Sequence, residues 1–200
     1  MTFYNKIKWV LGILMIFTLV LTTNLIDRNN FVRVKDSVET IYEDRIIAND
    51  LIFEMAKLVH EKEVAVSLSD SVFFSQTNLS VNNNIQNLIS RFELTKLTIE
   101  ESKIFNELKS NFQNLINSEN KLINSNFEDK TKVLIDISNI KFNLGDLSKV
   151  QLNEGKRQMS ISKHAMNTIE LFTKIEVYFL VLLAITIQII VMYQPKQKES

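Results

Sequence analysis

The chain has 200 residues, and its 23 Lys and Arg residues balance 23 Asp and Glu residues. A formal net charge of zero gives no electrostatic reason to expect a nucleic-acid partner. The absence of cysteine excludes disulfides, thiolate metal sites and a cysteine nucleophile. Three Gly and one Pro are too few for the turns of a sheet, so the composition predicts long helices with few connections.

The N-terminal region predicts a membrane span. Residues 9–26 contain no charged side chain, and Lys6 and Lys8 precede them. A helix of about 20 apolar residues crosses a hydrocarbon core. The alternative is a cleaved signal peptide, but the residues after the run lack a small-x-small cleavage pattern. We therefore expect an uncleaved anchor.

A heptad pattern follows and predicts a first long helix over residues 27–68. Apolar side chains recur with 3-4 spacing, which is a helical seam and not a strand pattern. Arg45 and Lys62 interrupt this seam. Its positions are Phe31, Val34, Val38, Ile41, Arg45, Ala48, Ile52, Met55, Val59, Lys62 and Val66.

Three further helices are expected. Asp70 is predicted to cap the start of a second helix near Ser71. A break near Thr98–Glu101 precedes the third helix, and a break over residues 125–130 precedes the fourth. The seam residues of these three helices are Phe73, Val81, Ile85, Leu88, Ile89, Phe92, Phe105, Leu108, Phe112, Leu115, Leu122, Val133, Ile137, Ile140, Leu144 and Leu147.

A second uncharged run completes the layout. We expect an all-α protein: an antiparallel four-helix bundle (up-down-up-down) whose first and fourth helices continue into two transmembrane helices. Lysines outside both runs place both termini in the cytoplasm of an inner-membrane protein. The expected segments are a tail (1–8), a span (9–26), an extracytoplasmic sensor-like domain (27–176), a span (177–193) and a tail (194–200).

This layout resembles the four-helix-bundle sensor domain of methyl-accepting chemotaxis proteins. IYEDR (41–45) is similar to that family's first-helix pattern, and SDSVFF (69–74) is similar to its turn into the second helix. The resemblance implies a homodimer that detects an external ligand and signals through its fourth helix. It extends over residues 1–193 and includes no HAMP linker, methylated hairpin or kinase-binding region.

Charges on the seam are the features most informative about a site. For Arg45 and Lys62 there are two interpretations: each side chain reaches water along its stem, or each has a buried partner. Arg45 lies 19 residues after the first run and Glu154 lies 23 before the second. Both heights are roughly 30 Å along a helix. We predict a structural polar layer in which Arg45 faces Glu154 within or between subunits, with Gln151 or Glu43 as possible substitutes.

No catalytic or metal site is predicted, no cofactor is expected, and no ligand-binding residue can be assigned. His60 and His164 lie at different heights, and the carboxylate set of a di-metal bundle is absent. The polar run 149–164 is either a solvated stalk or a loose, switch-like element. The favoured function is a membrane-anchored sensor, not an enzyme, whose partners are the lipid bilayer, a second copy, an external molecule or protein and a signalling partner in trans. The alternative is a structural or assembly protein without a ligand.

Overall fold

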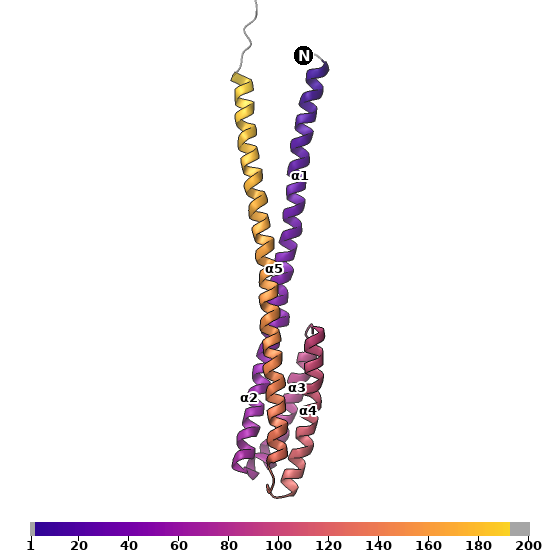
Figure 1. Ribbon diagram of the computed structural model, residues 1–200, viewed down its shortest axis with the longest axis vertical. Helices are drawn as coiled ribbons and strands as arrows, with labels where there is room; N and C mark the ends of the chain where they lie inside the picture. Colours follow the sequence, from indigo (N-terminus) through magenta and orange to yellow (C-terminus); the bar gives the residue numbers. More distant parts are fainter. Residues whose placement is uncertain (1–2, 193–200) are drawn as a thin grey trace, which may run out of the picture. The chain divides into compact units, whose positions relative to one another are not determined.

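The computed structural model describes residues 3–192, which are helical except at three short connections (Figure 1). The elements are α1 (Phe3–Thr40), the π-helical turn η1 (Ile41–Ile46), α2 (Ile47–Leu68), the π-helical turn η2 (Phe73–Thr77), α3 (Asn78–Glu93), α4 (Ile99–Asn124) and α5 (Thr131–Met192). No strand occurs among these residues. The predicted all-α class is confirmed. The predicted tail 194–200 and Tyr193 lie outside the described residues, as do residues 1–2.

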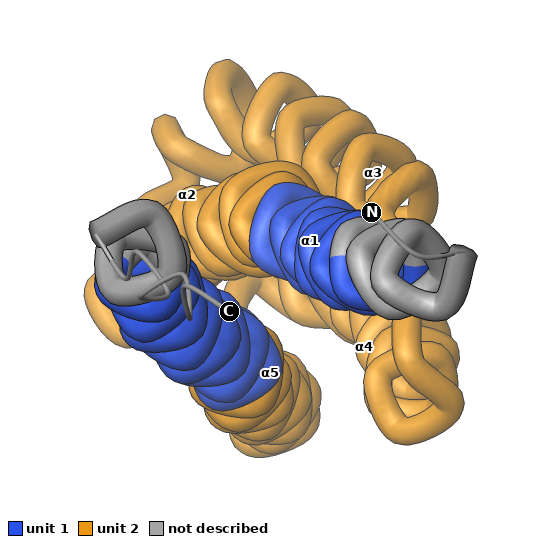
Figure 2. The backbone as a smooth tube through the Cα atoms, turned by 90° about the horizontal axis from the view of Figure 1, so that it is seen from above, with its two compact units in different colours: residues 1–37, 160–200 blue, residues 38–159 orange. Residues whose placement is uncertain are grey.

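The chain divides into two compact units (Figure 2). One consists of residues 38–159, and the other combines residues 1–37 with 160–200. The first unit includes fewer residues at both ends than the predicted domain 27–176. It contains α2, α3, α4 and the N-terminal part of α5, which run alternately up and down as a four-helix bundle (Figure 1). The predicted bundle is therefore confirmed.

The first helical path runs from α1 through η1 into α2 without a cap or turn between them. From Arg45 to Val66, every predicted seam position is buried. The seam prediction is wrong nearer the N-terminus, where Phe31 and Val38 are exposed. The adjacent residues Asn30 and Ser37 are buried there instead, so the buried face before the π turn is offset by one residue from the predicted seam.

Short polar connections separate the helices of the bundle. Ser69 ends α2 with a left-handed backbone, and the Asp70 carboxylate accepts a hydrogen bond from the Phe73 amide at 3.0 Å. Asp70 thus caps the next helix as predicted. The turn before α5 places Asn126 and Phe127 at positive φ, and the Phe127 ring packs 5.4 Å from the Phe74 ring.

The core of the 38–159 unit consists of the predicted apolar seams. Phe92 and Phe105 are buried against each other, with ring centroids 4.9 Å apart. Burial of such side chains, at about 25 cal/mol per Å² of apolar surface, is the main force that closes the bundle. Other fully enclosed residues are Leu51, Met55, Leu108, Phe112, Leu115, Leu122, Ile137, Ile140 and Leu147.

The predicted span 9–26 falls on α1, and residues 177–192 of the second predicted span fall on α5. Within the described residues, no helix carries a segment that is both long and apolar enough to cross a membrane. The side chains of residues 3–10, 13, 184 and 187–192 are not among those described, and both predicted runs include some of them.

Candidate functional site: a buried polar layer around Arg45

Arg45 lies in η1, the π-helical turn between α1 and α2. A π turn arises where a helix accommodates one extra residue, and such turns are common at functional sites. The Arg45 side chain is only 7% exposed, although the seam on either side of it is apolar. A cation buried in this way requires partners, because loss of its hydration is costly.

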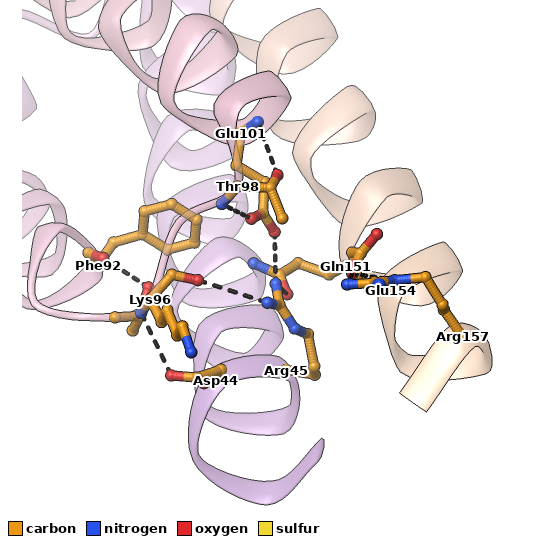
Figure 3. A network of polar contacts seen from close by, with 10 residues as sticks. Asp44, Arg45, Phe92, Lys96, Thr98, Glu101, Gln151, Glu154 and Arg157 are labelled. Carbon is orange, nitrogen blue, oxygen red and sulfur yellow. Dashed lines mark hydrogen bonds and ion pairs between the residues drawn. The ribbon is translucent and has the colours of Figure 1, made fainter. Parts of the chain in front are cut away.

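Three segments supply those partners (Figure 3). Arg45 Nη1 donates to Glu101 Oε1 of α4 at 2.7 Å and to Gln151 Oε1 of α5 at 3.0 Å. Arg45 Nη2 donates to the Lys96 carbonyl at 3.4 Å. The guanidinium therefore connects α4, α5 and the connection between α3 and α4, and we call Arg45, Glu101 and Gln151 the Arg45 layer.

Glu101 is held by the start of its own helix as well. Its Oε2 accepts from the Thr98 amide at 2.6 Å, and the Thr98 hydroxyl accepts from the Glu101 amide at 3.2 Å. This is a capping box, in which two unsatisfied amides at the helix start are paired reciprocally. Glu101 is fully buried, so one carboxylate both begins α4 and neutralises Arg45.

The structure gives Arg45 a different carboxylate from the predicted Glu154. Glu154 pairs instead with Arg157 on its own helix, at 2.7 Å. Gln151, which was considered as a substitute, does contact Arg45. The prediction counted heights along helices one and four and overlooked the carboxylate that α4 brings into the core. Pairing between two subunits concerns a second copy and stays a prediction.

Glu101 is the residue of this layer that the sequence analysis does not identify, because there it only marks the break before the third helix. The signal was present: the sequence Thr98–Ile99–Glu100–Glu101 has the capping-box spacing before an apolar run. A capping glutamate on the core side of its helix is a natural partner for a buried arginine.

The Arg45 layer is incompletely satisfied. Within the described residues, Arg45 Nε and Gln151 Nε2 are buried and have no hydrogen-bond partner. An unmet buried donor costs about 1–3 kcal/mol. The contacts of Arg45 thus hold the guanidinium in place but leave two donors of the layer without acceptors. A small change in free energy can therefore shift the hydrogen bonds of this layer.

A second buried cation, Lys62, forms a closed cluster deeper in the bundle. Its ammonium donates to Glu119 at 2.7 and 2.9 Å and to the Asn78 side-chain oxygen, and Asn78 donates to Glu119 at 3.2 Å. Lys62 is 0% exposed. The interpretation that it reaches water along its stem is wrong, and the paired interpretation holds.

Burial is the dominant influence on Lys62. It lowers the pKa of the ammonium below the usual 10.5, and the attraction of Glu119 opposes this shift. Lys62 does not line the groove beside the Arg45 layer or the smaller groove next to it. We therefore assign the Lys62 cluster to the architecture of the core.

Neither histidine forms a metal centre with other residues of the described part of the chain. His60 is exposed and lies 3.2 Å from Glu63 on the same helix. No group of three or more His, Asp or Glu side chains in the described residues is arranged to hold a metal ion.

Comparison with known proteins gives one match. A family described as "four helix bundle sensory module for signal transduction" matches residues 1–164. No curated protein matches the chain. No solved structure matches it either.

Proposed function

Because this chain belongs to the family of four-helix-bundle sensory modules for signal transduction, we propose that it is a membrane-anchored sensor that detects an extracytoplasmic molecule. The family match over residues 1–164 carries this proposal. The proposed role is binding without catalysis. The sensor passes its signal to a separate partner protein, and it has no nucleic-acid partner.

The membrane part of the proposal rests on the sequence. The uncharged runs 9–26 and 177–193, with lysines outside both of them, favour an inner-membrane protein with both termini in the cytoplasm. Residues 27–176 then lie outside. Since the chain has no native cysteine, single cysteines test this directly. A cysteine replacing Ser125 should react with a membrane-impermeant maleimide in intact cells, and one replacing Ser200 should react only after lysis.

The continuity of α5 supports a route for the signal. This helix extends from Thr131 to Met192 without a break, and Gln151 is part of it. A shift of α5 at the Arg45 layer is therefore carried along the helix axis. Sensor function requires two states with different ligand affinities, and the unmet donors of the layer are the feature that favours a second state.

Disulfide trapping tests this sensory role. The Ser148 hydroxyl of α5 donates to the Asn49 side chain of α2 at 3.1 Å, so the pair Asn49→Cys and Ser148→Cys should crosslink readily. The control pair is Asn111→Cys and Asn143→Cys, which replaces a 2.8 Å contact between α4 and α5 in the core. We expect a stimulus to change the rate of the first pair and leave the second unchanged. Insensitivity to every component of the growth medium would favour the structural alternative.

A homodimer is part of the proposal. Tyr42 and Phe53 are large apolar side chains of the first helical path that the single chain leaves exposed. Exposed apolar surface of this kind is typical of protein interfaces. A Phe53→Cys variant should then form a disulfide-linked dimer at low protein concentration, whereas a Glu54→Cys variant, about 100° around the same helix, should form less.

A further inference from the structure

A groove of about 570 Å³ opens beside the Arg45 layer in the 38–159 unit. Its walls are apolar, with Ile41 and Ile46 from η1 and Leu152 and Met159 from α5. Arg45 and Gln151 contribute to the same lining. Small-molecule sites commonly combine apolar walls with a few polar groups that fix the ligand's orientation, and their volumes are of this order.

The charges of the groove restrict what it can bind. Its lining contains two cations, Arg45 and Lys156, and no carboxylate. Glu101 balances Arg45, while Lys156 is exposed at the groove and forms no ion pair within the described residues. A cationic ligand is disfavoured here, and an anionic one is favoured.

The unmet donors specify the ligand further. Arg45 Nε and Gln151 Nε2 both require an acceptor. A carboxylate is well suited, because its two oxygens accept from neighbouring donors and pair strongly with a guanidinium. The apolar walls require that the rest of the molecule be apolar as well.

Building on the proposed sensory function, we infer that this groove binds a small monocarboxylate with a compact apolar body. The carboxylate accepts hydrogen bonds from Arg45 and Gln151 and is attracted by Lys156, while the body packs on Leu152 and Met159. Both unmet nitrogens are shielded from solvent, so binding requires the two side chains to turn toward the groove. The ligand then competes with Glu101 for the guanidinium, which alters the contact between α4 and the first helical path.

Three probes with one carbon skeleton test the charge requirement. Titration calorimetry on the purified full-length chain would compare 4-phenylbutyrate, the uncharged 4-phenylbutyramide and the cationic 4-phenylbutylamine. We expect 4-phenylbutyrate to bind, the amide to bind about tenfold more weakly or worse, and the amine not to bind. Equal binding of the three probes, or no binding of 4-phenylbutyrate, would overturn the inference.

Substitutions test the position of the site. Gln151→Leu should weaken 4-phenylbutyrate binding by about tenfold to a hundredfold, the value of one hydrogen bond to a charged group. Lys156→Ala should weaken it a few-fold, since the ammonium is exposed. Lys149→Ala removes another exposed cation of α5 that does not line the groove, so it should leave affinity unchanged. A loss of affinity that is equal in the Lys149 and Lys156 variants would place the probe elsewhere.

Glu101→Gln separates this mechanism from simple charge attraction. Removal of the competing carboxylate should strengthen 4-phenylbutyrate binding, and unchanged affinity would contradict the competition. The sensory function is scored separately by the Asn49–Ser148 crosslink, and binding is measured on the chain without these substitutions because both positions line the groove. Binding of 4-phenylbutyrate without a change in crosslinking would support the site and refute the sensory function. A crosslinking response to other stimuli without 4-phenylbutyrate binding would support the sensory function and refute the site.

Discussion

Replacement of Lys62 by methionine tests how the core of the bundle accommodates charge. Methionine keeps an unbranched apolar side chain and removes the ammonium. In the native chain that ammonium is fully buried and bonds to both Glu119 oxygens, at 2.7 and 2.9 Å. Lys62→Met therefore leaves the Glu119 carboxylate in the core with only the Asn78 amide, at 3.2 Å.

The expected cost follows from the burial of both partners. Removal of one member of a buried ion pair costs about 3–5 kcal/mol, because the remaining charge is uncompensated. The lowered pKa of Lys62 indicates that desolvation outweighs the attraction of Glu119. The double variant Lys62→Met/Glu119→Leu should consequently be more stable than Lys62→Met alone. Asn78, left without partners, should keep it about 1–3 kcal/mol below the native chain.

Urea unfolding followed by circular dichroism would measure these differences. Lys57→Met is the matched control, because Lys57 and Glu54 form a solvent-exposed pair at 3.7 Å. Exposed pairs contribute up to about 1 kcal/mol. A Lys62→Met cost no larger than that of Lys57→Met, or a double variant less stable than the single one, would refute the reasoning.

Three other substitutions probe separate interactions. A hydrogen bond from Lys141 lowers the pKa of Glu63 below its usual 4.5, so the stabilisation by this carboxylate is present above that value and is lost as the pH falls through the folded-state pKa. The difference in unfolding free energy between the native chain and Glu63→Gln, measured in urea, should accordingly fall towards zero between about pH 7 and pH 3. A difference that does not change with pH would contradict the stabilising contact between Glu63 and Lys141. Thr98→Ala removes the acceptor for the Glu101 amide and should cost about 0.5–2 kcal/mol, read as a lower thermal midpoint; Thr95→Ala is the comparison from the same connection. Phe112→Ala empties a fully buried position and should cost about 3–5 kcal/mol in urea unfolding, whereas a loss below about 1 kcal/mol would contradict the packing.

The sequence was sufficient to predict the helices and most of the core, because both depend on local periodicity. Ala48, Ile52 and Val59 are buried as the seam predicted. The same seam identified Arg45 and Lys62 as unusual, since each places a charge where an apolar side chain is expected. What local periodicity recovers is the face of each helix and its approximate ends.

The partners of these charges were not recoverable in the same way. Arg45 and Glu101 are 56 positions apart, and Lys62 and Glu119 are 57 apart. Their meeting depends on the axial offset between the first helical path and α4, which the periodicity within either helix does not determine. The π turn η1 was not predicted either, because one extra residue in a helix leaves the 3-4 spacing of the seam recognisable.

The two buried cations mark opposite properties of the same bundle. The Lys62 ammonium donates to three acceptors, the two Glu119 oxygens and the Asn78 side-chain oxygen. Asn78 is the first residue after η2. Arg45 lies within a π turn, but its Nε and the Nε2 of Gln151 have no acceptor among the described residues. A fully satisfied network rigidifies a core, whereas a partly satisfied one leaves alternatives close in free energy.

A sensor needs both: a part that keeps its shape, so that a change elsewhere is transmitted, and a part that is easily shifted by a ligand. The groove opens beside the second kind of network, so a ligand there would act on the polar layer whose hydrogen bonds are incompletely satisfied.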